Sequence, residues 1–121
     1  MKLPLIVRPE AERDLAEAHD WYESKVTGLG SKFLLAIDAA LSSIQHTPEL
    51  YQIVYKNLRR ALIRRFPYGI FYLVQEARIV VISVCTPEEI LTRGVVVYND
   101  IIMWAYNHSL QSDPPTADRL S

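Results

Sequence analysis

Residues 58–84 read LRRALIRRFPYGIFYLVQEARIVVISV, and most of the predicted strands lie in this segment. Residues 70–74 and 79–84 are rich in the β-branched and aromatic side chains that favour strands, and the residues between them suit a tight turn. Residues 60–66 alternate with a period of two, which predicts a further strand. Neither face of that strand is purely apolar, so we expect its charged part to lie at an edge or over a groove.

Two amphipathic helices are predicted before these strands. Pro9 suits the first turn of a helix, residues 27–30 interrupt the helical pattern, and Thr47-Pro48 end it. The apolar positions recur every three or four residues and therefore share one face of each helix: Ala11, Leu15, Ala18 and Tyr22, then Phe33, Ile37, Leu41 and Ile44. Because the connection between them is short, the helices should form an antiparallel pair.

Together these patterns predict an α+β fold. A short apolar run at residues 3–7 supplies a first strand, so the order of elements becomes β-α-α-β-β-β. We expect the helical hairpin to pack on one face of a small, mostly antiparallel sheet. Trp21 and Tyr22 should lock the hairpin onto that sheet. Cys85, the lone cysteine, should be a buried strand residue.

Charge is segregated along the chain. The formal net charge is −1 over 121 residues, but residues 52–85 carry six basic side chains against one acidic one. The three histidines lack ligand spacing and no phosphate-binding glycine loop is present, so we expect no metal and no cofactor. Apolar runs are too short for a membrane span, and the N-terminus lacks the apolar stretch of a signal peptide. We therefore expect a cytoplasmic protein with no membrane partner.

Four segments carry a family resemblance. They are WYESK at the end of the first helix, GLGSKFLLAID at the start of the second, HTPELY after it, and above all RRALIRRFPYGIFYLV. Over about residues 2–84 the chain resembles the RelE/ParE superfamily of bacterial type II toxins, and its ParE-like branch in particular. The resemblance implies a small toxin associated with growth arrest and plasmid stabilisation, held inactive by a cognate antitoxin.

The resemblance implies one of two targets. In the ParE mode the toxin binds and poisons DNA gyrase, and in the RelE mode it cleaves messenger RNA on the ribosome. The cationic candidates for gripping the target or its phosphates are Lys56, Arg59, Arg60, Arg64 and Arg65. If the protein is a nuclease, the candidate catalytic residues are Arg64, Arg65 and Tyr68. An inactive remnant of such a toxin is the remaining alternative.

An antitoxin of this kind is expected to fold on binding and to cover the arginines with acidic residues. We expect it to dock in an apolar groove between the helical hairpin and the sheet. Its predicted contact residues are Phe33, Leu41, Ile44, Arg60 and Arg64. Without the usual C-terminal motif a sheet edge would be less covered, so we also expect a homodimer.

The resemblance stops at Cys85. Members of the superfamily usually close with a motif similar to His-x-x-Arg-Asn/Asp-Pro, whereas this chain reads CTPEEILTRG over residues 85–94. A second reading frame through the Cys85 codon can spell His-Ser-Arg-Arg-Asn-Pro-Asp-x-Trp, so we hypothesise that residues 86–121 are a frameshift product. The alternative is an evolved extension with a strand at residues 95–98 and a helix at residues 100–110. We accordingly predict a toxin domain at residues 1–85 and an atypical, partly disordered extension at residues 86–121.

Overall fold

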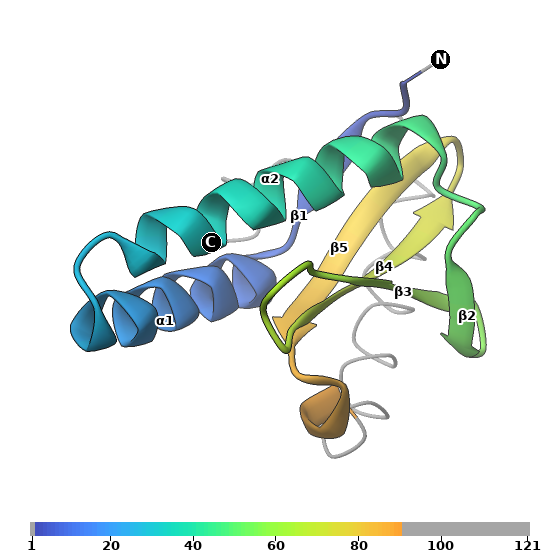
Figure 1. The fold of residues 1–121 in the computed structure, drawn as a ribbon. Coiled ribbons are helices and arrows are strands. Elements are labelled where there is room, and N and C mark those ends of the chain that lie inside the picture. The colour runs from blue at the N-terminus through green and yellow to red at the C-terminus, as the bar shows by residue number, and fades with distance from the viewer. Residues whose placement is uncertain (1, 91–121) are drawn as a thin grey trace.

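The computed structural model describes residues 2–90 and confirms the α+β fold. Its elements are, in chain order, β1 (Leu5–Val7), α1 (Pro9–Lys25), α2 (Leu29–His46), β2 (Gln52–Tyr55), β3 (Leu58–Leu62), β4 (Gly69–Gln75) and β5 (Arg78–Cys85). The two helices lie side by side against one side of the twisted sheet (Figure 1). The strand and the helix predicted at residues 95–98 and 100–110 lie outside the described residues.

The sheet has five strands in the order β1-β5-β4-β3-β2. Strand β1 pairs with β5 in parallel, and every other pairing is antiparallel. The β4–β5 hairpin turns at Glu76 and Ala77, whose φ angles of 52° and 61° are those of a two-residue hairpin turn. The turn predicted at residues 75–78 is therefore confirmed. Strand β5 is buried along its whole length, in keeping with its place between β1 and β4.

Two strand predictions are wrong in detail. The sequence predicts three strands after the helices, but the structure has four, because Gln52–Tyr55 pairs with β3 as an edge strand. Three of its four residues are exposed, so its sequence shows no clear alternation. The strand predicted at residues 60–66 is instead β3, which ends at Leu62. Arg65 has a φ of 72°, so Arg64 and Arg65 lie in a turn and not on a strand.

A carboxylate fixes the turn between the two helices. Glu23 accepts hydrogen bonds from the backbone N–H groups of Gly28 (2.8 Å) and Gly30 (3.0 Å) at the start of α2. These bonds satisfy donors that a helix N-terminus leaves without an intrahelical partner, and the bond from Gly28 is the main cause that lowers the pKa of Glu23. At Gly30 an added Cβ would lie 2.7 Å from the backbone oxygen of His19, so α1 and α2 approach closely there.

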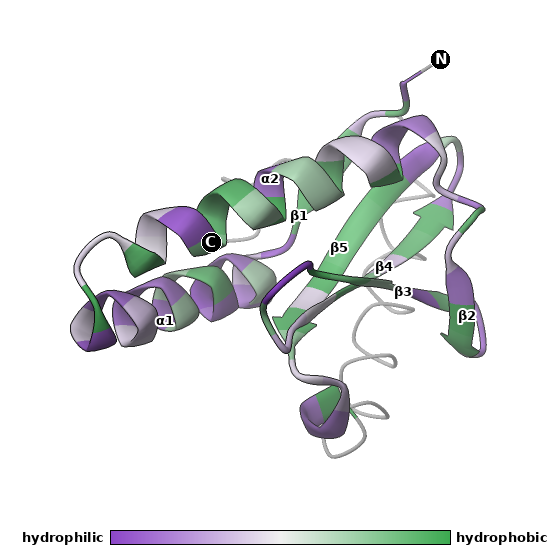
Figure 2. Cartoon of the chain, viewed as in Figure 1, coloured by the Kyte–Doolittle hydropathy of each residue, from purple (hydrophilic) through white to green (hydrophobic). Residues whose placement is uncertain are grey.

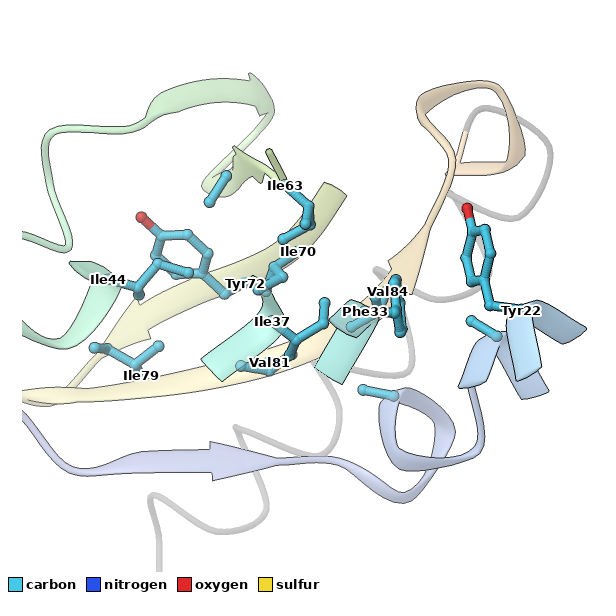
Figure 3. Packing of buried hydrophobic residues seen from close by; sticks show 13 residues of the cluster. Tyr22, Phe33, Ile37, Ile44, Ile63, Ile70, Tyr72, Ile79, Val81 and Val84 are labelled. Carbon is cyan, nitrogen blue, oxygen red and sulfur yellow. The ribbon is translucent and has the colours of Figure 1, made fainter. Parts of the chain in front are cut away.

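The main core lies between the helical hairpin and the sheet. Figure 3 shows side chains from both helices and from the sheet converging there: Tyr22, Phe33, Ile37, Ile44, Ile63, Ile70, Tyr72, Ile79, Val81 and Val84. The apolar faces predicted for the helices are thus confirmed, and Figure 2 shows apolar residues running along β4 and β5. The hydroxyl of Tyr72 donates to the carbonyl of Pro48 at 2.6 Å, which ties β4 to the segment after α2.

The other face of the sheet carries a second apolar cluster. Its buried members are Leu58, Phe71, Leu73, Val80, Ile82, Cys85 and Ile90. Cys85 is buried there, which confirms its prediction as a strand residue. The prediction for Trp21 is wrong, because its side chain is 55% exposed and only the neighbouring Tyr22 packs into the core.

A helical turn begins directly after β5. The Thr86 hydroxyl accepts a hydrogen bond from the N–H of Glu89 (3.3 Å), and the Glu89 carboxylate accepts one from the N–H of Thr86 (2.9 Å). This reciprocal pair is a capping box, and Pro87 occupies the first helical position, where no N–H is needed. Ile90 then packs into the second apolar cluster. The segment directly after β5 is thus a capped helical turn packed against the sheet.

Candidate functional site: an arginine turn beside an apolar groove

Two exposed arginines sit on a closed turn. Residues 63–68 connect β3 to β4, and the N–H of Ile63 donates across this loop to the carbonyl of Tyr68 at 2.9 Å. Arg64 and Arg65, which we call the arginine turn, are both exposed. The loop therefore presents two neighbouring guanidinium groups to solvent.

Aromatic packing anchors the arginine turn to the helices. The ring of Phe66, the next residue along, meets Tyr22 of α1 and Phe33 of α2 edge to face, with centroid separations of 5.0 and 5.2 Å. Such pairs stabilise by about 0.5–1.5 kcal/mol each beyond the apolar area that they bury. The backbone that carries the two arginines is thus held in place before any partner binds.

Within residues 2–90 the chain leaves these arginines without an internal counter-ion. Arg59, Arg60, Arg64 and Arg65 have no carboxylate oxygen of the described residues within the 4.0 Å of an ion pair. Their positive charge is therefore available to an external anion, provided that the guanidinium is exposed and otherwise unengaged. The arginine turn meets both conditions in the described part of the chain.

The remaining cationic candidates lie elsewhere. Arg59 points to the helix side of the sheet and donates to the carbonyls of Glu49 (3.2 Å) and Tyr51 (2.6 Å), so it has a structural role. Arg60 lies on the opposite face and donates to the Gln52 side chain at 3.4 Å. Lys56 lies in the β2–β3 turn. The five cations predicted as one target-binding set are thus divided among separate places, and only Arg64 and Arg65 stay together.

Tyr68 ends the loop that carries the arginine turn. It lines a cavity of about 410 Å³ together with three carboxylate residues, Asp14, Glu17 and Glu89, whereas Arg64 and Arg65 line a different one. Burial is the main cause that raises the pKa of the Tyr68 hydroxyl, and Tyr22 and Glu89 raise it further. Tyr68 and the two arginines therefore line two different cavities, which share Tyr22 and Pro67.

The arginine turn forms one rim of an apolar groove of about 860 Å³. Tyr22, Leu29, Leu35, Ala36, Phe66 and Pro67 form its apolar lining, and Lys32 joins Arg64 and Arg65 as a third cation. Sequence reasoning missed Leu29, Lys32 and Leu35. The sequence did contain a signal for Leu35, because this apolar residue lies off the apolar stripe of α2. The structure shows it 68% exposed.

The residues predicted to contact an antitoxin lie in different environments. Phe33 and Ile44 are fully buried in the core, so they offer no surface for a partner to contact. Leu41 is partly buried against that core. Arg64 lies on the rim of the apolar groove, while Arg60 lies on the far face of the sheet. Of the predicted set, Arg64 alone lines this groove.

Residues 2–90 contain neither a cluster of potential metal ligands nor a membrane-spanning helix. No group of three or more histidine, cysteine or acidic residues is placed to hold a metal ion in this part of the chain. Neither α1 nor α2 is long and apolar enough to cross a membrane. The fold and the site thus define a small α+β protein with an exposed cationic turn beside an apolar groove.

Comparison with known proteins gives the family. The family model described as ParE toxin of type II toxin-antitoxin system, parDE, matches residues 5–90. The chain therefore belongs to the ParE toxin family, and it is the toxin component of a type II toxin–antitoxin system, whose expected partner is an antitoxin. The match continues past Cys85, where the sequence resemblance alone had stopped.

A solved structure has the same fold. The structure titled "Chromosomal ParDE TA system from P. aeruginosa" superimposes with a TM-score of 0.62 and 17% sequence identity. The match covers 70% of this chain and 96% of that one. At this identity the likeness supports the fold alone. No curated protein sequence gives a significant match.

Proposed function

We propose that the chain arrests growth by binding and poisoning DNA gyrase, and that a cognate antitoxin neutralises it by covering the arginine turn. The observation that carries this proposal is the arginine turn itself, with its two exposed guanidinium groups on an anchored loop and no carboxylate partner within residues 2–90. Membership of the ParE family makes gyrase the target to test first.

Binding requires fewer chemical groups at this site than catalysis does. A guanidinium donates paired hydrogen bonds to a carboxylate or a phosphate, and an anchored turn loses little conformational freedom when it binds. Cleavage of RNA would also require a group that accepts a proton, and arginine stays protonated at any physiological pH. Tyr68, the candidate for that task, lines the other cavity and has a raised pKa. The geometry therefore supports a binding toxin better than a nuclease.

The apolar groove supports a specific kind of antitoxin segment. An amphipathic helix places its apolar residues along one stripe, which suits a lining of leucine, tyrosine and phenylalanine side chains. Acidic residues beside that stripe would meet Lys32, Arg64 and Arg65 at the rim. A segment that fills the groove in this way also blocks access to the arginine turn. Neutralisation then follows from steric exclusion of the target.

Gyrase supercoiling assays with purified chain test the proposal. Wild-type protein should inhibit supercoiling, and replacing both arginines (Arg64→Ala with Arg65→Ala) should weaken inhibition at least about tenfold, because each hydrogen bond to a charged group contributes about 1.5–3 kcal/mol. Arg60→Ala is the matched control on the far face of the sheet and should inhibit as wild type does.

Three outcomes would contradict the proposal in different ways. Cleavage of messenger RNA in a translation extract, with gyrase unaffected, assigns the RelE mode. Controlled expression that harms no cells assigns an inactive remnant. Equal inhibition by the wild type and the doubly substituted chain leaves gyrase as the target but removes the arginine turn from the interface.

A further inference from the structure

The far face of the sheet is buried although α1 and α2 both pack on the opposite face (Figure 1). The second apolar cluster lies on this far face, and every member of it except Ile90 comes from a strand. The buried strand members are at most 5% exposed: Leu58, Phe71, Leu73, Val80, Ile82 and Cys85. Side chains on one face of a sheet reach such burial when a second layer covers them.

The described chain contributes one segment from outside the strands to this face, the turn after β5. Pro87, Glu88 and Ile90 line a groove of about 550 Å³ together with residues of β2, β3 and β4. Ile53 of β2 also lines the groove and is 49% exposed, so the groove is partly open. This far-face groove is therefore adjacent to Ile90, where the described part of the chain ends.

The residues that follow Ile90 have a composition that suits this groove. Residues 91–104 read LTRGVVVYNDIIMW, and eight of the ten residues from 95 to 104 are apolar or aromatic. The four residues 91–94 connect this run to Ile90, and four residues of extended chain span up to about 14 Å. From β5 to β2 the sheet is three strand spacings wide, roughly 14 Å at about 4.8 Å each. The run can therefore reach every strand that lines the groove.

We propose that residues 95–104, which we call the apolar tail, dock on the far face of the sheet and fill the groove beside Ile90. The apolar tail is then the second layer that the buried strand residues require. Docking is intramolecular, because the tail leaves the described chain at the groove itself, so its effective concentration is on the order of millimolar. The proposal concerns the chain as translated, and it holds for an evolved extension and for a frameshift product alike.

The charge of the groove favours the apolar tail over other occupants. The charged residues of the lining are Arg60 and Glu88, one of each sign, whereas three cations line the groove beside the arginine turn. An acidic antitoxin segment therefore suits the groove beside the arginine turn better. The apolar tail carries a single charge, Asp100, and needs no strongly charged counterpart. A second copy is not needed to explain the burial, because the strand residues are already buried in a single chain.

The docked tail has a consequence that rests on the proposed function. Arg60 lines the far-face groove, so the tail would screen it from other molecules. Partners would then be directed to the arginine turn, whose groove lies on the helix side of the sheet. The docking itself can be measured without gyrase or antitoxin. Failure of this proposal is thus distinguishable from failure of the proposed function.

The two tryptophans of the full chain report on the docking. Trp104 lies in the apolar tail and Trp21 is 55% exposed, so Trp21→Phe isolates the tail signal and Trp104→Phe isolates an exposed reference. Acrylamide is a suitable quencher because it is neutral, and the Lys25 ammonium lies 4.9 Å from the centre of the Trp21 ring. Trp104 should be quenched with a shallower slope than Trp21 and should emit at a shorter wavelength.

Two results of the quenching experiment would overturn the proposal. Equal slopes for Trp104 and Trp21 would show that the tail is not covered. Protection of Trp104 that is lost on dilution would assign the cover to a second copy, in the homodimer expected from the sequence, and not to the chain's own tail.

A substitution in the groove places the docked tail on the far face. Val54 lines the groove and packs against the second apolar cluster, whereas Leu50 lies outside the groove and is 79% exposed. Val54→Asp should steepen the quenching of Trp104. It should also speed alkylation of Cys85, a member of that cluster, at least about tenfold, because a carboxylate in an apolar contact favours the undocked form. Leu50→Asp is the matched control and should change neither measurement.

A substitution in the tail tests the same contact from the other side. Val96→Asp with Val97→Asp should have the effects of Val54→Asp, and Leu120→Asp, which places the same charge outside the apolar tail, should have none. Circular dichroism of the helices separates undocking from unfolding, since α1 and α2 pack on the opposite face. If Val54→Asp unfolds the chain, the substitutions in the tail decide. Folded variants of both kinds that quench and react as the wild type does would refute the docking.

Discussion

Gly30→Ala should destabilise the protein, although alanine ordinarily favours a helix over glycine. An ideal Cβ at this position would lie 2.6 Å from Cδ2, 2.7 Å from the backbone oxygen and 2.8 Å from Nε2 of His19. Forcing an extra carbon into such a contact costs about 1–3 kcal/mol, while the helix propensity of alanine returns at most about 1 kcal/mol. We therefore expect a net loss of about 1–2 kcal/mol in the free energy of unfolding.

A second background shows which contacts carry this loss. His19→Ala removes the two ring contacts but leaves the backbone oxygen at 2.7 Å. In that background Gly30→Ala should therefore cost less, by about 1 kcal/mol. Urea unfolding followed by circular dichroism gives both differences from the shift of the midpoint at constant slope. A Gly30→Ala chain as stable as the wild type would refute the close approach of α1 and α2, and with it the positioning of the groove.

Three further predictions concern single residues. Tyr72→Phe should cost about 1–2 kcal/mol by leaving the Pro48 carbonyl without its donor. Burial raises the pKa of Tyr72 from 10.0 to about 12, so the folded state favours the neutral phenol. The free energy of unfolding of the wild type should therefore fall as the pH rises from 10.0 towards 12. Urea unfolding of Tyr72→Phe should not show that fall. The stability contribution of Glu23 depends on pH in the opposite direction, because its pKa in the folded state lies below the ordinary 4.5. The contribution is present above pH 4.5 and is lost as the pH falls further. Glu23→Gln should therefore reduce the loss of stability at acid pH, and an unchanged loss would count against the helix cap. Sequencing the gene through the Cys85 codon should show a second frame that spells the family motif; a second frame that cannot spell it would rule out the frameshift hypothesis.

Much of the fold follows from periodic patterns in the sequence. The pattern of apolar residues shows which face of each helix is buried and that β4 and β5 are core strands. The structure confirms this for the helical stripes that end in Tyr22 and Ile44 and for both strands. Strand β2 could not be predicted in the same way, because it is an edge strand defined by its pairing with β3 and not by its own pattern. The same holds for the end of β3, which depends on a left-handed backbone at Arg65.

The site was less accessible to sequence reasoning. Four arginines in a short segment look like one cluster, but alternation sends Arg59 and Arg60 to opposite faces of the sheet, and the turn separates Arg64 and Arg65 from both. The acidic cavity joins residues from α1 with Glu89 after β5, and only the fold brings these together. Local patterns therefore indicate which residues are charged, but not which of them share a surface.

Whether the arginine turn contacts gyrase can be measured from the affinity of the purified chain for gyrase before and after substitution of the two arginines. We expect wild type to bind with an affinity that falls as salt rises. We expect Arg64→Ala with Arg65→Ala to bind at least about tenfold more weakly and with a smaller salt dependence, and Arg60→Ala to bind as the wild type does. Equal affinities for all three chains, with the same response to salt, would contradict this expectation.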